Sequence, residues 1–317
     1  MSQIANLFLV GAPKSGTTFL FDLLKPSPAI FCPENKEPAY FLVADRMVRF
    51  READVRPPSL VYGRKEYEAL YATATNETYR IDASTHYLSS PETAERIKAA
   101  APDSRIVAVL REPVSRAFSH YLMGIRDGYI TESFEEALAQ EDAEMSDPTP
   151  LWAEHFRILR RSLYLDGLHA YLKAFGPDRV RVYLFSDLKE DPDWLVNDLG
   201  EFLGIDLSHS SQNAETANKN AYAEARFPRI NRMVAQYRTS RFRLLANRIL
   251  PPAARRFLRE KFDAVRLKQA AKPQITAEQR DMLQNRLGED YRQALELATE
   301  TGILKRPAKD HSPSQPS

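Results

Sequence analysis

The residues best suited to chemistry begin with a glycine-rich turn, Gly11-Ala-Pro-Lys14-Ser15-Gly16-Thr17-Thr18, which follows a short apolar run and opens a predicted helix. Glycines in such a turn let successive backbone N–H groups point into one concavity, and the helix N-terminus adds the positive end of its dipole. The sequence therefore predicts a phosphate-binding loop whose candidate ligands are Lys14, Ser15, Gly16, Thr17 and Thr18.

The lysine of this loop does not lie where a nucleoside triphosphatase has it. The GxxxxGK[ST] motif places lysine after the second glycine, where it serves the β- and γ-phosphates beside a Mg²⁺-binding hydroxyl. Here Thr17 takes that position and the lysine comes earlier, at Lys14. A lysine inside the loop would instead lie beside a group attached to a shorter 5′-phosphate.

A second candidate anion site follows a later apolar run, in Arg111-Glu-Pro-Val-Ser-Arg-Ala-Phe-Ser119. Arg111 would stand at the carboxyl edge of a sheet and Ser119 on the next helix, so the two side chains can converge on one anion. The guanidinium fork suits the oxygens of a phosphate. The pair therefore indicates a second phosphate position.

Together these residues resemble the sulfotransferases that use 3′-phosphoadenosine 5′-phosphosulfate (PAPS). The loop around Lys14 is similar to the family's 5′-phosphosulfate loop, and Arg111 with Ser119 is similar to its 3′-phosphate motif. The resemblance covers roughly residues 7–203. It implies transfer of a sulfuryl group from PAPS to a hydroxyl or amine, release of 3′,5′-ADP, and no metal requirement. At Ser186 cytosolic members place an aromatic residue near the adenine, so the way the purine is held stays open.

Sulfuryl transfer needs a base for the acceptor's proton and a cation for the charge on the leaving oxygen. Lys14 is the predicted cation. Glu37, in Lys-Glu-Pro-Ala-Tyr-Phe, resembles the catalytic glutamate of the glycan sulfotransferases. His86 lies near the position of the catalytic histidine in cytosolic sulfotransferases. The motif favours Glu37 as the base and keeps His86 as the alternative, although Ala83 stands where glycan enzymes usually carry lysine.

The motif around Glu37 also favours a carbohydrate or glycolipid acceptor. Two other functions remain open. A P-loop kinase or nucleoside triphosphatase is weakened by the missing Gly-Lys-Thr and by the lack of a clear strand-end aspartate for Mg²⁺. A non-catalytic module that binds PAPS or 3′,5′-ADP is disfavoured because Lys14 and Glu37 are both present.

Short apolar runs that alternate with amphipathic stretches must position these residues. This alternation predicts an α/β fold, with a P-loop-like parallel sheet, helices on both faces and a helical C-terminal portion. The candidate strands are residues 7–10, 29–32, 79–82, 105–110 and 180–185, and the candidate helices are residues 17–24, 91–101, 113–126, 162–175, 192–203 and 276–299.

The composition fits a folded protein of balanced charge, with 317 residues, 43% of them hydrophobic, and 44 basic against 43 acidic side chains. This balance argues against a nucleic-acid partner. One cysteine, Cys32, and scattered histidines predict no metal site. No run is long enough to span a membrane, and the N-terminus lacks the basic region of a secretory signal, so we expect a cytoplasmic protein. We expect one sulfotransferase domain over residues 1–305 and a disordered tail over 306–317.

Two stretches depart from the overall charge balance. Residues 127–156 carry nine acidic side chains and no lysine or arginine, whereas residues 226–272 carry fourteen basic side chains and two acidic ones. Both stretches can be solvated faces, and they can also face each other. Alternatively, the basic segment 226–272, which we expect to be helical, forms a docking surface for an anionic acceptor or a peripheral membrane contact.

Overall fold

A computed structural model describes residues 4–44, 59–127, 130–145, 157–207, 223–225, 267–269 and 273–306, and every structural statement below concerns these residues. Five parallel strands form the central sheet, in the order β2-β3-β1-β4-β5. They are β1 (Leu7–Gly11), β2 (Ile30–Phe31), β3 (Tyr79–Asp82), β4 (Arg105–Leu110) and β5 (Val180–Leu184). The predicted α/β class and all five predicted strands are confirmed.

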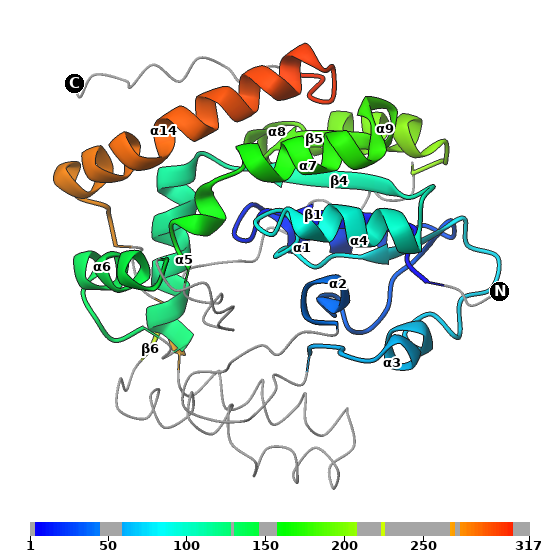
Figure 1. Ribbon diagram of the computed structural model, residues 1–317, viewed down its shortest axis with the longest axis horizontal. Coiled ribbons are helices and arrows are strands. Elements are labelled where there is room, and N and C mark those ends of the chain that lie inside the picture. The colour runs from blue at the N-terminus through cyan, green and yellow to red at the C-terminus, as the bar shows by residue number, and fades with distance from the viewer. Residues whose placement is uncertain are drawn as a thin grey trace, which may run out of the picture.

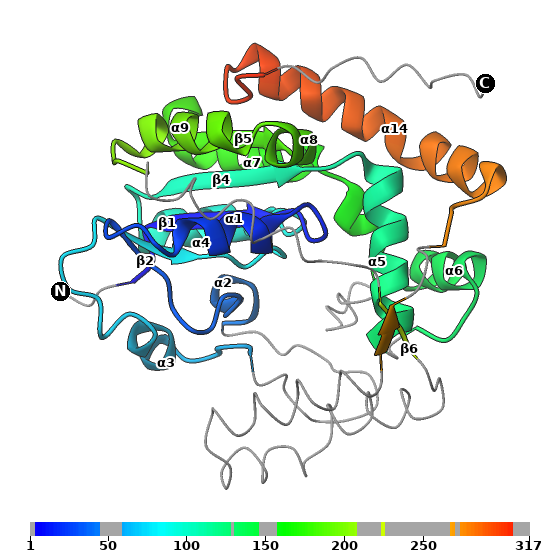
Figure 2. The same cartoon turned by 180° about the vertical axis from the view of Figure 1, so that it is seen from behind.

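Helices cover both faces of this sheet (Figures 1 and 2). Alternate residues of β1 point to opposite sides, so Phe8 and Val10 enter one core and Leu7 and Leu9 enter the other. The first core includes α4 (Glu92–Ala100), α7 (Leu165–Phe175) and the C-terminal part of α14 (Ala277–Glu300). The second includes α1 (Thr17–Leu24), α8 (Phe185–Glu190) and α9 (Pro192–Leu203). Burial on both faces explains why the strands read as continuous apolar runs.

A third apolar cluster lies beyond the carboxyl end of β4. It joins α5 (Pro113–Asp127), α6 (Phe134–Met145) and the first half of α14, and in both views α5 runs across the end of the sheet beside α6. The remaining elements are α2 (Tyr40–Val43), α3 (Arg64–Ala69), the 3-10 helices η2 (Arg160–Ser162) and η3 (Pro177–Arg179), and the paired strands β6 (Ala223–Ala225) and β7 (Leu267–Gln269).

Several predicted boundaries differ from the structure by one or more residues, and in two cases a side chain that the sequence analysis did not recognise as a cap is the reason. The helix expected to begin at Ser162 begins at Leu165, since Asp290 of α14 accepts hydrogen bonds from the N–H groups of Tyr164 (2.6 Å) and Leu165 (3.3 Å). The fifth strand ends at Leu184 because the Asp187 carboxylate accepts from the Leu184 N–H at 2.8 Å and starts α8.

The basic segment and the tail are only partly described. Of residues 226–272 the structure describes only Leu267–Gln269, and these form strand β7 where we expected helix; the rest of the segment lies outside the described residues. Arg306, the first residue of the predicted tail, lies over the Trp194 ring at 3.8 Å and pairs with Asp191 at 2.9 Å. The folded part therefore includes Arg306, and residues 307–317 lie outside the described part.

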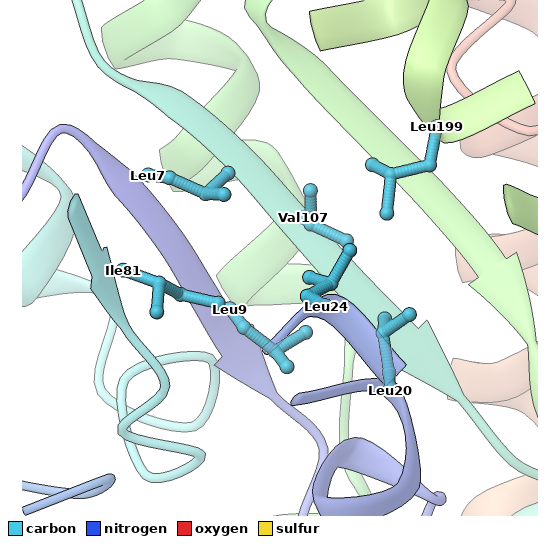
Figure 3. A pocket seen from close by; sticks show the side chains of 7 residues that line it. All are labelled: Leu7, Leu9, Leu20, Leu24, Ile81, Val107 and Leu199. Carbon is cyan, nitrogen blue, oxygen red and sulfur yellow. The ribbon is translucent and has the colours of Figure 1, made fainter. Parts of the chain in front are cut away.

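The sheet leaves a small apolar gap beneath α1 and α9. A cavity of about 10 Å³ is enclosed by aliphatic side chains from both helices and the three central strands, as Figure 3 shows: Leu7, Leu9, Leu20, Leu24, Ile81, Val107 and Leu199. It has room for about one water molecule and no polar group to hold one, so it belongs to the core. Among the described residues, no helix is both long and apolar enough to cross a membrane.

Candidate active site

The predicted site residues come from loops at the carboxyl edge of the parallel sheet. Lys14 follows β1, Glu37 follows β2, His86 follows β3 and Arg111 follows β4. Because parallel strands all end at the same edge, four segments that are distant in sequence meet there. This edge is where open α/β sheets bind their ligands.

The loop after β1 turns through two residues with left-handed backbone. Lys14 and Gly16 both have positive φ angles, 67° and 84°, and α1 begins at Thr17. A left-handed lysine is uncommon and occurs at sites where backbone N–H groups must converge. Ser15 between them is fully buried, and within the described part of the chain its Oγ has no hydrogen-bond partner. A buried hydroxyl in this state fits a ligand that brings its own acceptor oxygen.

Gly16 cannot be enlarged without disturbing the site. A Cβ at this position would lie 3.0 Å from Leu188 and 3.1 Å from the Phe185 ring. Gly16→Ala is therefore expected to destabilise the fold by ~1–2 kcal/mol through its left-handed backbone alone, and to weaken nucleotide binding by displacing Phe185. Gly204→Ala is the matched control, because Gly204 has a φ of 68° but open space around its Cβ position. Thermal unfolding and calorimetry with 3′,5′-ADP should show that both variants lose stability and only Gly16→Ala loses affinity.

Three arginines lie near Lys14 of the loop. Burial lowers the pKa of Lys14 to about 8, and repulsion by Arg126, Arg111 and Arg116 contributes to the shift, against the opposing attraction of Asp127. Burial also lowers the pKa of Arg111, and it lowers that of Arg116 to about 10. A buried lysine whose pKa is lowered by neighbouring arginines favours an anion beside it.

Arg111, the residue predicted for the second phosphate, also contacts the loop predicted for the first. Its Nη1 donates to the carbonyl oxygen of Lys14 at 2.9 Å, and its guanidinium lies over the Phe185 ring at 4.6 Å. The Tyr164 hydroxyl donates to the carbonyl oxygen of Arg111 at 2.8 Å. Ser119 lies half-buried on α5, the helix that follows Arg111. The arginine that we assign to the second anion thus also holds the first loop.

Arg116 is a residue of this site that the sequence analysis missed. It is fully buried, its Nε donates to Ser162 Oγ at 2.9 Å, its Nη1 donates to the carbonyl oxygen of Pro13 at 3.4 Å, and its Nη2 donates to that of Ile158. Through the contact with Pro13, Arg116 therefore helps to hold the loop after β1. Its place inside the motif that starts at Arg111 is the signal that could have identified it.

Glu37 has two partners and remains open to solvent. Its Oε1 accepts from Lys36 Nζ at 3.0 Å, its Oε2 accepts from Thr85 Oγ1 at 3.2 Å, and 34% of its side chain is exposed. Lys36 Nζ also donates to Thr18 Oγ1 at 3.0 Å. The structure thereby links Glu37 to the first turn of α1, and Lys36, to which we gave no role, is the link.

His86 lies in a different environment. It is only 5% exposed, and Nη1 of the buried Arg161 contacts its Nδ1. A guanidinium can only donate, so this ring nitrogen is the acceptor and its lone pair is engaged. His86 is therefore less suited than Glu37 to take a proton from an external group. Arg161, 75 residues further along the chain, was not identified from the sequence.

Within the described ranges, no group of three or more His, Cys, Asp and Glu side chains could hold a metal ion. The arrangement offers chemistry of another kind. Lys14 and Arg111 supply positive charge for phosphate groups, and Ser15 and the start of α1 supply hydrogen-bond donors. Glu37 supplies a partly exposed carboxylate, which Lys36 links to the first turn of α1.

The sequence model of the sulfotransferase family matches residues 6–209 of this chain. Among solved structures, the crystal structure of a sulfotransferase from Alicyclobacillus acidocaldarius is similar, with a TM-score of 0.59 and 32% sequence identity, over 65% of this chain and 83% of that one. The family match includes all five strands of the central sheet and every candidate site residue, whereas β6, β7 and α14 lie beyond it.

Several named relatives are glycan sulfotransferases. The mouse heparan sulfate glucosamine 3-O-sulfotransferase 3B1 is 24% identical over 204 residues, which are 64% of this chain and 47% of the relative. The human bifunctional heparan sulfate N-deacetylase/N-sulfotransferase 3 is 23% identical over 64% of this chain and 22% of its own length. The membrane-associated sulfotransferase kil1 of Dictyostelium discoideum is 28% identical over 39% of this chain and 24% of its own. This chain thus spans less than half the length of each of these relatives.

Proposed function

This chain belongs to the sulfotransferase family, and we propose that it transfers a sulfuryl group from PAPS to a hydroxyl or amine acceptor and releases 3′,5′-ADP. One observation supports this more than any other: the Arg111 guanidinium donates to the carbonyl oxygen of Lys14. The residues assigned to the two phosphate ends of the nucleotide are therefore parts of one site. The buried, unpartnered hydroxyl of Ser15 in the same loop fits a phosphate oxygen.

When bound, PAPS supplies the sulfuryl group, and the protein supplies charge, orientation and a base. Lys14, Ser15, Gly16, Thr17 and Thr18 would hold the 5′-phosphosulfate end, where the positive end of α1 adds to the ammonium. Arg111 and Ser119 would hold the 3′-phosphate. The Lys14 ammonium would offset the charge that the leaving oxygen gains as its bond to sulfur breaks.

Glu37 is the proposed base. It would take the proton from the acceptor's hydroxyl or amine as that atom bonds to sulfur, and its side chain is partly exposed to the solvent from which an acceptor would arrive. Thr85 and Lys36 orient its two oxygens. His86 is the second candidate, and its engagement by Arg161 is the reason for placing it second.

Nucleotide affinity should depend on the 3′-phosphate. Losing a charge-assisted hydrogen bond costs ~1.5–3 kcal/mol, or roughly 10- to 150-fold in affinity. We expect calorimetry to show that 3′,5′-ADP binds more tightly than 5′-ADP by about this factor, and that Arg111→Ala removes most of the difference. Arg105→Ala is the control, since Arg105 lies at the opposite end of β4. Equal affinities of the wild type for the two nucleotides would contradict the assignment of Arg111.

A carbohydrate or glycolipid is the proposed acceptor. The motif around Glu37 and the names of the heparan sulfate relatives support this class. The test is incubation with sulfur-labelled PAPS and a panel of saccharides, glycolipids and phenols, followed by chromatography of the label. Label in a saccharide or glycolipid product supports the proposal, and label confined to phenols would assign the protein to small-molecule acceptors.

The two other functions make different predictions in the same assay. A P-loop kinase would require Mg²⁺ and would transfer phosphate from ATP, whereas the position of Lys14 inside the loop fits the shorter 5′-phosphosulfate group. A binding module would retain 3′,5′-ADP and leave PAPS intact with every acceptor.

A further inference from the structure

Asp82 is a buried carboxylate that the proposed chemistry does not use. It ends β3 and has no exposed surface. Its Oδ1 accepts from the N–H (3.0 Å) and the hydroxyl (2.6 Å) of Ser84, and its Oδ2 accepts from the hydroxyls of Tyr67 (2.8 Å) and Tyr87 (3.0 Å). Four donors thus converge on one carboxylate.

Two of these hydroxyls also hold the segment that carries Glu37. Ser84 Oγ accepts from the N–H of Ala39 at 2.8 Å, and the Tyr87 hydroxyl accepts from the N–H of Phe41 at 3.2 Å. On the other side of Glu37, the Ala83 N–H donates to the carbonyl oxygen of Lys36 at 3.1 Å. The backbone is therefore held both before and after Glu37 by residues that follow Asp82.

The turn needs such support because Ala39 has a left-handed backbone, with φ at 50°. For residues other than glycine this conformation is unfavourable and persists only where neighbouring contacts enforce it. An ionised carboxylate can only accept hydrogen bonds, so the hydroxyls of Ser84 and Tyr87 must donate to it. Their oxygen lone pairs are then left facing the N–H groups of Ala39 and Phe41.

We propose that Asp82 is a positioning residue, which through the hydroxyls of Ser84 and Tyr87 fixes the turn that places the Glu37 carboxylate for proton transfer. The inference rests on the proposed function, in which Glu37 is the base. Thr85, three residues after Asp82, completes the arrangement through its hydrogen bond to Glu37 itself.

The cost of this carboxylate to the fold agrees with a functional role. Burial raises the pKa of Asp82 to about 6, although the hydrogen bonds from Ser84, Tyr67 and Tyr87 oppose the rise. A carboxyl group with a raised pKa stabilises the fold below its unfolded pKa of ~3.9 and loses that contribution as the pH rises through about 6. At neutral pH the ionised Asp82 therefore destabilises the fold. A residue retained only for packing would not need to carry this charge.

Tyr87→Phe and Tyr67→Phe form a matched pair for the test. Both tyrosines are fully buried, and each substitution removes one hydroxyl that donates to Oδ2 of Asp82. Of the two hydroxyls, the one that accepts from Phe41 is that of Tyr87. Displacing a reacting group by about 1 Å can cost 10²-fold, so Tyr87→Phe should lower kcat by about 10- to 100-fold. Its Kd for 3′,5′-ADP should stay unchanged, and Tyr67→Phe should retain most of its kcat.

The experiment has two readouts. Hydrogen–deuterium exchange of peptides that contain Ala39 and Phe41 reports the turn without any acceptor. Turnover of labelled PAPS, with the best acceptor of the panel or with water alone, reports catalysis. Faster exchange and lower kcat in Tyr87→Phe, but not in Tyr67→Phe, support the proposal. Ser84→Ala tests the Ala39 arm in the same way if Tyr87→Phe does not fold.

Asp82→Asn shows whether the carboxylate acts through these hydroxyls. If it does, combining Asp82→Asn with Tyr87→Phe should lower kcat no further than Asp82→Asn alone, because both act on one chain of hydrogen bonds. Additive effects on kcat would overturn the inference, as would unchanged exchange or an unchanged kcat in Tyr87→Phe. If the wild type itself does not turn over PAPS, the proposed function fails instead, and the exchange data still decide whether the turn depends on Tyr87.

Discussion

Glu37→Gln is expected to lower kcat by about 10²–10⁴, the usual contribution of a positioned base. Glutamine keeps the shape of the side chain and can still accept from Lys36 or Thr85, so the fold and the affinity for 3′,5′-ADP should change little. The measurement is single-turnover transfer from labelled PAPS, with nucleotide affinity determined separately by calorimetry.

Glu34→Gln is the matched control, because Glu34 is an exposed carboxylate in the same loop. His86→Ala provides the contrast: it should cost little in kcat, since the ring is buried against Arg161. The assignment is wrong if Glu37→Gln stays within a few-fold of the wild type while His86→Ala is inactive and still binds 3′,5′-ADP. That outcome would place the protein with the histidine-using sulfotransferases and make a carbohydrate acceptor less suitable.

Lys14→Ala should lower kcat by about 10²–10³, the range for one lost donor that acts in the transition state. The reason is that, in the proposed reaction, the ammonium would lie where charge develops on the leaving oxygen and would contribute more to the transition state than to ground-state binding. Lys25→Ala, at the far end of α1, is the control. A variant with a nearly normal kcat and only a raised KM for PAPS would make Lys14 a binding contact.

The pH dependence offers a second test of Lys14. Its pKa is lowered to about 8, so above that pH the free protein loses the ammonium that the proposed reaction uses. The kcat/KM for PAPS should therefore fall as the pH rises through about 8, because this ratio reports the free protein. The basic limb should be absent from the residual activity of Lys14→Ala.

The strands could be predicted, and the two candidate anion-binding motifs could be proposed, because their signals are local. Each strand is a short apolar run buried on both faces, and the glycines on either side of Lys14 indicate a tight loop. The start of α14 was also predictable, since Thr276 and Gln279 cap each other within four residues.

Contacts between distant segments could not be predicted in this way. The link from Lys36 to Thr18 joins the loop after β2 to helix α1, and the contact of Arg161 with His86 spans 75 residues. In the sequence, Asp82 is only a polar residue at the end of a predicted strand. Its partners Tyr67 and Tyr87 come next to it only in the folded chain. Local motifs were enough to propose which side chains do the chemistry, whereas the residues that hold those side chains became evident only in the folded chain.

The most direct test of a PAPS-dependent sulfotransferase is a count of both products from one reaction. The reaction contains wild-type protein, labelled PAPS and the preferred acceptor, together with a chelator of divalent metals. We would then quantify the labelled product and the 3′,5′-ADP in the same sample. Our account predicts equal amounts of the two, formed without added metal and nearly abolished in Glu37→Gln. Intact PAPS beside bound 3′,5′-ADP, or transfer that requires Mg²⁺ and ATP, would contradict it.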